Sequence, residues 1–508
     1  MAVGRTTAIA LQGLVGALVD VEASSSGGLP GFKLVGLPDA ALAQSASRVH
    51  AAAKNSGCSI SQYNIVVNLS PAALPKQGAG FDLAIALACF AASGQVSQRS
   101  VAQIAHLGEV GLDGRVRPVL GVLPAVHAAA AAGVPRIMVP VGNAAEAGLV
   151  PGIEVIPVAS LREAAIRHGA DLEPIEVEPV LPPAPAAAPG DDLELADVIG
   201  HAEAVRALIA AAAGGHHLLF VGPPGSGKTM LAERLPAILP DLGEAESLLA
   251  TSIRSLHDLS GVRALVTRPP FEAPHHTASA AALVGGGSRI RPGAAVRASH
   301  GVLFLDEAPE FAGSALDALR QPLESGVVSI ARASGTADYP ARFQLVLAAN
   351  PCPCGNFGVR GAECTCRPDS RRRYLARLSG PLLDRVDIRL DVPRLSSVQL
   401  ALGAAGPTTT TAAARAQVDG ARAAAAARLA GTPWRTNAAV PGTWLEEHRP
   451  SASAIAPLER AMDRGVLTMR GFHRTLRVAW TIADIAGRTS PGVDEIGVAH
   501  ALREWSAA

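Results

Sequence analysis

The residues with the clearest chemical meaning form one loop, Gly222-Pro-Pro-Gly-Ser-Gly-Lys-Thr229. It follows an apolar run, His217–Val221, that predicts a buried strand, and it precedes Met230–Leu235, which predicts the start of a helix. In this setting the spacing of the glycines, lysine and threonine is typical of phosphate binding, because backbone N–H groups and a helix N-terminus face the anion. Lys228 is expected to bind the β- and γ-phosphates of ATP, and Thr229 to bind Mg²⁺. The candidate phosphate-binding residues are Gly222, Pro223, Pro224, Gly225, Ser226, Gly227, Lys228 and Thr229.

Two later apolar runs also end in polar side chains. Val302–Leu305 is followed by Asp306 and Glu307. Asp306 is expected to hold Mg²⁺, and Glu307 is expected to polarise the attacking water as general base. The alternative is a buried strand with two acids at its exposed end, but the position downstream of a P-loop favours the catalytic interpretation. Leu345–Ala349 ends in Asn350, which resembles the sensor-1 residue of AAA+ ATPases, although an asparagine after a strand is commonly a turn former.

Two arginines complete the candidate catalytic set by resemblance. Leu378–Asp387 resembles the AAA+ segment that carries the arginine finger, so Arg385 is expected to reach the ATP of a neighbouring subunit. An ordinary surface Asp–Arg pair is the alternative. Gly471–Ile485 predicts an amphipathic helix, on which Arg474 resembles the sensor-2 arginine that reaches the nucleotide from the lid. The rival candidates on this helix are Arg470 and Arg477.

A cysteine cluster forms a second candidate site, for Zn²⁺. The thiols follow a CxC-x9-CxC spacing, and they belong to Cys352, Cys354, Cys364 and Cys366. Four thiolates on a short loop suit tetrahedral zinc, although CxC is tighter than the usual spacing. The alternatives are four free thiols or a redox-sensitive pair. The other two cysteines, Cys58 and Cys89, are predicted to be simple core residues.

The composition limits the class of protein that positions these residues. The 508 residues suffice for roughly three domains. Lys+Arg and Asp+Glu each number 44, so no overall basic field demands a nucleic-acid partner, and a DNA surface must be local. No apolar run reaches the roughly 18–20 residues of a membrane span, and no secretory signal is evident at the start. The chain is therefore expected to be cytoplasmic, with no membrane partner.

The pattern along the chain predicts an α/β protein of three parts. Residues 1–170 mix strands and helices, 171–190 form a Pro/Ala-rich linker, 191–395 carry the nucleotide motifs, and 396–508 read as a helical lid. Strands are expected at Ile65–Leu69, Arg136–Pro140 and Ile153–Ile156, and helices at Leu83–Ala92 and Val122–Ala132. The threonine-rich segment Ala404–Ala414 is expected to be a loop.

Residues 1–170 contain two distinctive stretches, Leu74–Asp82 and Gly108–Pro118. These stretches resemble the catalytic loop and the next strand pair of the Lon protease domain, but the catalytic pair of that domain is missing. Lon domains use a Ser–Lys dyad. The serine position falls on Gly80 and the lysine position on Leu123, while Lys76 matches a lysine outside the dyad. The resemblance implies an inactive α+β Lon-like domain that serves in assembly or partner binding.

Six further stretches carry a specific pattern: they are Gly28–Asp39, Arg268–Thr277, Ala281–Gly287, Arg291–Ala294, Tyr339–Phe343 and Asn350–Gly355. Together they resemble the YifB/ComM family of magnesium-chelatase-like AAA+ proteins, and the resemblance covers essentially the whole chain. The resemblance implies an AAA+ P-loop ATPase core in which Val198 and Ile199 line the adenine pocket. It also implies a hexameric ring that acts as an ATP-driven DNA helicase or branch-migration factor in DNA uptake and recombination. The alternative is a chelatase- or chaperone-like remodeller of a protein partner.

A ring of this kind is expected to present two insertions to DNA in its pore. One spans residues 262–300, and the other is the predicted β-hairpin Val328–Asp338, because positive loops can track phosphates without reading sequence. The candidate DNA contacts are Arg289, Arg291, Arg297 and Arg332. A solvated arginine is an equally good interpretation of each. Arg371–Arg373 is either a basic patch or a helix start, and His275 and His276 are expected at the pore or a subunit boundary.

Overall fold

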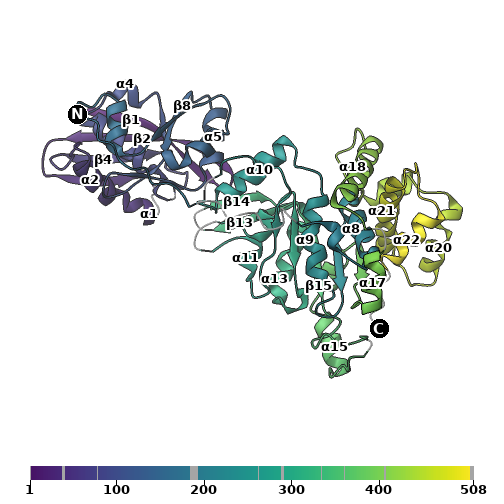
Figure 1. Ribbon diagram of the computed structural model, residues 1–508. Coiled ribbons are helices and arrows are strands. Elements are labelled where there is room, and N and C mark those ends of the chain that lie inside the picture. The colour runs from purple at the N-terminus through teal and green to yellow at the C-terminus, as the bar shows by residue number, and fades with distance from the viewer. Residues whose placement is uncertain are drawn as a thin grey trace.

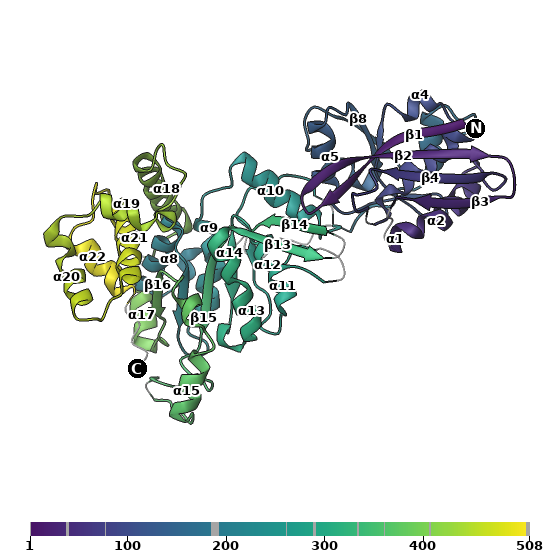
Figure 2. The same cartoon turned by 180° about the vertical axis from the view of Figure 1, so that it is seen from behind.

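The computed structural model describes residues 2–36, 40–76, 78–183, 193–260, 262–287, 291–332, 335–359, 361–405 and 408–503. Figures 1 and 2 show an elongated molecule with an N-terminal α+β unit at one end, a central α/β unit, and a helical unit at the other end. No helix in the described ranges has both the length and the hydropathy of a membrane span.

The N-terminal unit is built on a seven-stranded mixed sheet. Its strands, in spatial order, are β3 (Gly31–Val35), β4 (Asn64–Ser70), β2 (Val15–Ser26), β1 (Ala2–Gln12), β5 (Ala105–His106), β8 (Arg136–Pro140) and β9 (Glu154–Val158). A short ladder joins β6 (Glu109–Val110) to β7 (Val116–Arg117). The helices are α1 (Ala40–Ala43), α2 (Ser45–Asn55), α3 (Asp82–Ala92), α4 (Gln98–Val101), α5 (Val122–Ala131), α6 (Ala144–Ala147) and α7 (Leu161–Arg167).

Helix α3 is the centre of this unit's core. All of its side chains are buried, including Cys89, and Cys58 is also buried, as the sequence predicts. A Cβ atom on Gly4 of β1 would lie 2.0 Å from the Ala88 carbonyl oxygen, so only glycine permits this close approach of strand and helix. The predicted strands and helices of this unit are found within one or two residues of their expected bounds.

The central unit contains a parallel five-stranded sheet that carries the nucleotide motifs. Its strands, in order, are β11 (Phe271–Glu272), β12 (Val302–Leu305), β15 (Gln344–Ala349), β10 (Leu218–Val221) and β16 (Ile388–Asp391). The central strands are wholly buried, which explains their continuous apolar sequences. The helices are α8 (Ala202–Gly214), α9 (Lys228–Ile238), α10 (Glu244–Ser255), α11 (Ala280–Val284), α12 (Ala294–Arg297), α13 (Gly313–Ala318), α14 (Arg320–Ser325), α15 (Pro368–Leu375) and α16 (Gly380–Leu383).

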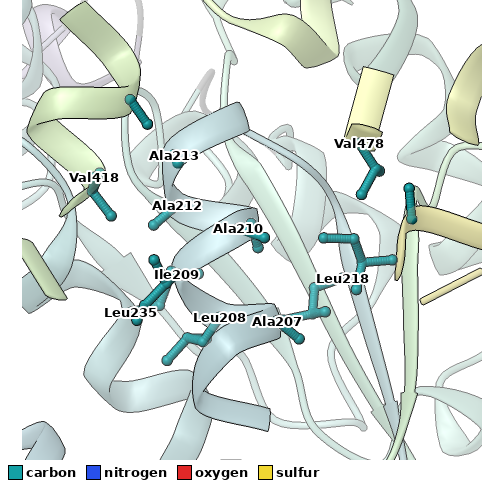
Figure 3. Close-up of a cluster of buried hydrophobic side chains, with 14 of the residues drawn as sticks. Ala207, Leu208, Ile209, Ala210, Ala212, Ala213, Leu218, Leu235, Val418 and Val478 are labelled. Carbon is teal, nitrogen blue, oxygen red and sulfur yellow. The ribbon is translucent and has the colours of Figure 1, made fainter. Parts of the chain in front are cut away.

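The C-terminal unit is helical among its described residues. It comprises α17 (Ser397–Ala405), α18 (Thr411–Arg428), α19 (Gly442–Glu447), α20 (Ala452–Asp463), α21 (Met469–Ile485) and α22 (Val493–Ala501). Figure 3 shows how the small side chains of α8 pack with Leu218, Val418 and Val478, which joins the sheet to the lid. The expectation of a loop over Ala404–Ala414 is wrong at both ends. Helix α17 continues to Ala405, and Thr410 caps the N-terminus of α18 through the Ala413 N–H, at 3.1 Å.

The N-terminal unit contacts the central unit through two sets of residues. At the turn between β1 and β2, Gln12 Nε2 donates to the Thr336 carbonyl oxygen at 2.5 Å. Thr336 belongs to the hairpin of β13 (Val327–Arg332) and β14 (Gly335–Pro340), which confirms the predicted hairpin. At the second contact, the Ser255 hydroxyl of α10 donates to the carboxylate of Glu146, whose pKa is raised by burial. The two units therefore share a packed polar and apolar boundary.

A buried histidine pair crosses the N-terminal unit. The Nε2 atoms of His106 and His168 lie 3.0 Å apart, and their Nδ1 atoms contact Thr6 Oγ1 at 2.7 Å and Ser100 Oγ at 2.9 Å. Burial, with the nearby Arg136 charge, lowers the pKa of His168 to about 4, and burial lowers the pKa of His106 well below its usual range. The fold therefore holds both imidazoles neutral.

Acidification is expected to destabilise this unit between about pH 6.5 and pH 4, because the unfolded histidines titrate near 6.5 and bind protons that the folded pair excludes. The contribution of His168 to stability is present above pH 6.5 and decreases as the pH falls toward its folded pKa, with a total loss of about 3 kcal/mol. Amide hydrogen exchange in α3 at pH 7 and pH 4.5 measures the loss. His168→Gln should flatten this pH dependence, and the exposed His127→Gln is the control; parallel curves for both variants would contradict the assignment.

Candidate nucleotide-binding site

The P-loop lies between β10 and the first turn of α9. Gly225 and Gly227 adopt positive φ angles of +73° and +91°, which turn the loop in a way that suits glycine. A Cβ atom on Gly222 would lie 2.1 Å from the Val392 carbonyl oxygen, so this position also requires glycine. The local sequence thus explains the shape of the loop.

Lys228 extends back over this loop. Its Nζ atom donates to the carbonyl oxygens of Gly222 at 2.7 Å and Pro223 at 2.9 Å, and to Asn350 Oδ1 at 3.2 Å. Burial lowers the pKa of Lys228, and the charges of Asp306 and Glu307 oppose that shift. The structure therefore brings together the P-loop lysine and the asparagine predicted to sense the γ-phosphate.

The two acids predicted after β12 lie at the same edge of the sheet. Thr229 Oγ1 donates to Asp306 Oδ2 at 2.7 Å, and these are the two oxygen donors expected to hold Mg²⁺. Glu307 has a left-handed backbone with φ of +50°, which is uncommon for a non-glycine residue. Its side chain is directed to His276, whose Nδ1 lies 3.3 Å from Glu307 Oε2.

The loop fits a nucleotide phosphate on its own chemistry. Among the described residues, Ser226 Oγ is one of the buried polar atoms without a hydrogen-bond partner, and it lies within the loop. A buried hydroxyl without a partner is costly, and a phosphate oxygen supplies the missing acceptor. Of the two residues expected near adenine, Val198 packs into the core. Ile199 lies against α17, since a Cβ atom placed on Gly403 would be 3.0 Å from Ile199 Cγ2. Their role with adenine stays a prediction.

Arg385 and Arg474 lie at the opposite edge of the sheet. Leu218 pairs in parallel with Ile388, so the segment before β16 lies at the start of β10, whereas the P-loop follows its end. A four-residue strand separates these edges by about 13 Å. Arg385 forms an ion pair with Glu324, and Arg474 donates to the Arg385 carbonyl oxygen at 3.0 Å. Within one chain Arg474 therefore does not lie at the P-loop edge, and its role as sensor 2, like the role of Arg385 as a finger for a neighbour, stays a prediction.

Arg474 instead belongs to a buried polar network between the lid and the sheet. Its guanidinium donates to Asp387, which also contacts His216 Nδ1 at 3.2 Å, and His216 Nε2 lies 2.8 Å from Thr481 Oγ1. Burial alone would raise the pKa of Asp387, but the His216 hydrogen bond and the Arg474 charge outweigh it and hold this pKa well below its usual range. The rival candidates Arg470 and Arg477 bind Asp384 and the Val440 carbonyl oxygen.

The four cysteines converge on one point beside the site. Their Sγ atoms all lie within 4.8 Å of one another, and Cys352 Sγ lies 3.4 Å from Cys354 Sγ and 3.7 Å from Cys364 Sγ. The backbone N–H of Asn356 lowers the pKa of the Cys354 thiol to about 6. This arrangement could hold a metal ion.

The candidate DNA contacts differ in their placement. Arg291 is exposed and lines a cavity of about 460 Å³ between the N-terminal and central units. Arg297 donates twice to Glu272 Oε2, at 2.8 and 3.0 Å, so it is not the solvated arginine of the alternative interpretation, and its contact with DNA stays a prediction. Arg289 and the side chain of Arg332 lie outside the described residues. Arg371 lies on α15 with its guanidinium 3.9 Å from the Phe357 ring, and Arg373 lies on the same helix.

Sequence reasoning missed the roles of three residues at the site. His276 contacts Glu307, a contact that the sequence did not indicate, and its expected place at the pore or a subunit boundary stays a prediction. Arg394 Nη2 lies 3.3 Å from the Pro224 carbonyl oxygen, and Gly355 approaches the same proline. His276 and Arg394 could have been found from their positions, since each is a polar residue soon after a parallel strand, β11 or β16. Parallel strands bring their carboxyl ends to one edge of the sheet, where the P-loop also lies.

Comparison with known proteins identifies the family. The sequence family described as magnesium chelatase, subunit ChlI, matches residues 194–400, its C-terminal family matches 408–503, and a further ChlI family matches 21–143. The chain is 50% identical to an uncharacterized protein of Mycobacterium tuberculosis, over 100% of both chains. It is 40% identical to competence protein ComM of Haemophilus influenzae over 94% of this chain and 93% of that protein, and 39% identical to YifB of Escherichia coli over 92% and 90%. The chain belongs to the YifB/ComM family of magnesium-chelatase-like proteins.

A partial match extends to Lon proteases. This YifB/ComM family member is 32% identical to Lon protease of Mycolicibacterium smegmatis over 34% of this chain and 23% of that protein. The match supports a Lon-like domain. At the positions predicted for the dyad, Gly80 has no side chain and Leu123 is fully buried, with its N–H donating to Glu146. Neither residue supplies a nucleophile or a base.

Removal of the His276 imidazole is expected to raise the basal ATPase rate of this YifB/ComM family member. His276 holds Glu307 in a partly exposed contact, and such pairs contribute about 0.2–1 kcal/mol. Releasing the carboxylate by His276→Ala should therefore raise DNA-free turnover by up to about fivefold. Steady-state phosphate release measures the effect, with the adjacent His275→Ala as control. A fall in the rate would instead assign His276 to transition-state stabilisation.

Proposed function

We propose that this protein is an ATP-hydrolysing motor that acts on DNA as a hexameric ring, with a role in DNA uptake and recombination. The observation that carries the proposal is the division of the catalytic set between two edges of one sheet. Lys228, Thr229, Asp306, Glu307 and Asn350 lie together, whereas Arg385 lies at the opposite edge. A site divided in this way is completed when the edge carrying Arg385 faces the P-loop of a second copy.

Each residue at the first edge has a defined task. Lys228 and the loop N–H groups hold the phosphates of ATP, while Thr229 and Asp306 supply the oxygens that hold Mg²⁺. Once the Glu307 side chain has left His276, its carboxylate accepts a proton from the attacking water. Asn350 orients that water. Mg²⁺ held by Thr229 and Asp306 would neutralise charge on the phosphate oxygens, and Arg385 of a neighbouring copy of the chain would add a second positive charge.

The surface near the P-loop supports association between copies. Val398 and Leu402 of α17 are 65% and 69% exposed and lie four residues apart, on one face of the helix. Gly403 of the same helix packs against Gly200, upstream of the P-loop. An apolar face beside a divided active site is suited to a subunit boundary. Arg474 holds the backbone of Arg385, so we assign it the task of positioning the finger segment.

The proposed DNA contacts are the β13–β14 hairpin and the exposed Arg291. A ring places such insertions along its pore, where positive side chains bind phosphates of single-stranded or branched DNA. The name of the H. influenzae relative, competence protein ComM, supports a role in DNA uptake. Residues 1–170 are proposed to serve as an assembly platform in the cytoplasm, and Zn²⁺ is the proposed ion for the four cysteines.

A DNA-dependent ATPase and unwinding assay tests this function. The full-length protein should hydrolyse ATP faster with forked or branched DNA than with linear duplex or without DNA, and it should displace a strand. An ATPase that neither binds DNA nor responds to it would favour the alternative, a remodeller of a protein partner. Light scattering with and without a non-hydrolysable ATP analogue tests the ring.

A further inference from the structure

The four-cysteine loop follows the strand that ends in Asn350 and leads into α15. Its described residues, 351–359 and 361–367, form turns but no helix or strand. Cys352 is fully buried at the base of the loop, and its Sγ accepts the Phe357 N–H at 3.3 Å. A segment of this length without regular structure needs another source of order, because each fixed residue costs about 1–2 kcal/mol of conformational entropy.

The sulfur geometry matches a tetrahedral zinc centre. A Zn–S distance of about 2.3 Å places the sulfur atoms of a Cys₄ site about 3.8 Å apart. The Sγ atoms of Cys352 and Cys354 each lie 3.7 Å from Cys364 Sγ and 3.4 Å from each other, and Cys366 Sγ lies within 4.8 Å of all three. A disulfide requires about 2.05 Å, so these sulfurs are not bonded in pairs. Zn²⁺ is redox-inert and prefers four thiolates in a closed structural site of this kind.

The loop is in direct contact with the P-loop. Gly355 has a positive φ of +79°, and a Cβ atom there would lie 2.4 Å from Pro224 Cδ. Asn350, two residues before Cys352, accepts from Lys228 Nζ at 3.2 Å. The buried Tyr374 of α15 closes the other side, with its hydroxyl near the backbone N–H of Asn350. The cysteine loop thus lies against both the phosphate-binding loop and the residue predicted to orient water.

We infer that Zn²⁺ bound by the four cysteines holds one wall of the ATP site, so that nucleotide binding depends on metal occupancy. The bound ion fixes the conformation of the cysteine loop, and the loop packs Gly355 against Pro224. This contact determines the position of the Asn350 side chain relative to Lys228. The inference rests on the proposed ATPase function of the P-loop, but it does not require that DNA is the substrate. The ligand class is a divalent ion that prefers thiolates.

The first experiment measures metal content and nucleotide affinity on the full-length chain. Elemental analysis should find about one Zn²⁺ per chain. After chelation and restoration of Mg²⁺, the affinity for a fluorescent ATP analogue should fall at least about tenfold, and added Zn²⁺ should restore it. Cys364→Ser should lose both the zinc and the affinity. Cys58→Ala, which removes a thiol of the N-terminal core, should keep both.

The second experiment separates metal binding from the wall contact with two matched glycine variants. Gly355→Ala and Gly358→Ala carry similar backbone strain, since their φ angles are +79° and +74°. Among the described residues other than its chain neighbours, none has an atom within 4 Å of a Cβ at Gly358. Both variants should retain zinc. Gly355→Ala should weaken nucleotide binding at least about fivefold, whereas Gly358→Ala should bind as the wild type does.

Three results would overturn the inference. A zinc content well below one per chain in freshly purified protein removes the metal site. If the purified protein contains one zinc per chain but its nucleotide affinity does not change when the zinc is stripped, the metal does not support the ATP site. Unchanged affinity in Gly355→Ala would likewise show that the Gly355–Pro224 contact does not support it. Failure of the proposed motor gives a different pattern, because zinc-dependent nucleotide binding would persist while DNA left the ATPase rate unchanged.

Discussion

Glu307→Gln is expected to bind ATP and Mg²⁺ normally while hydrolysis falls about 10²–10⁴-fold. The substitution keeps the size of the side chain but removes the carboxylate that accepts a proton from water. The residues that hold the phosphates and metal, Lys228, Thr229 and Asp306, are not altered, so binding should persist. Equilibrium binding of a fluorescent ATP analogue and single-turnover phosphate release measure the two effects separately.

Glu310→Gln is the matched control for this experiment. Glu310 lies three residues further along the same segment, where it pairs with Arg377 at 3.1 Å and does not contact the P-loop lysine or threonine. Its replacement should leave hydrolysis within about twofold of the wild type, as expected for an exposed ion pair. Rapid hydrolysis in Glu307→Gln would remove Glu307 from its assigned role.

Arg385→Ala is expected to abolish turnover through the neighbouring subunit. The loss should be about 10³–10⁵-fold if the guanidinium stabilises the transition state as an arginine finger does. ATP affinity should change little, because Arg385 lies at the opposite edge of the sheet from the P-loop of its own chain. Arg470→Ala is the control, since Arg470 forms an exposed pair with the adjacent Asp384 and should tolerate removal.

Mixing two inactive variants tests whether the site is shared. Arg385→Ala chains retain Glu307, and Glu307→Gln chains retain Arg385, so a mixed ring contains boundaries with both groups intact. Random equimolar assembly makes about one boundary in four complete, and a corresponding part of the activity should return. No recovery in rings shown to contain both chains would place Arg385 outside the neighbour's site.

The sequence was sufficient for the features that depend on local pattern. The P-loop, the acids after β12 and Asn350 each follow an apolar strand, and parallel strands bring their carboxyl ends to one edge of the sheet. Strand positions were predictable for the same reason, since buried strands are continuous apolar runs. The hairpin of β13 and β14 was also evident from its alternation.

Features that depend on long-range packing were not predictable. The placement of Arg474 follows from contacts such as His216 with Thr481, which are 265 residues apart. The pairing of Arg297 with Glu272, and the approach of Gly355 to Pro224, likewise join segments that carry no shared local signal. The threonine run before α18 was ambiguous, because threonine favours both turns and helix N-caps.

The boundary between the first two units determines how the protein can be dissected. Leu14, at the turn after β1, packs against the core of the central unit, and Leu248 of α10 packs against the core of the N-terminal unit. Each unit therefore completes the hydrophobic core of the other. A truncated ATPase beginning in the linker would expose Leu248 and leave Ser255 without Glu146. Activities measured on such a fragment would therefore come from a protein with an exposed apolar surface. The smallest fragment suitable for biochemistry includes the Lon-like domain.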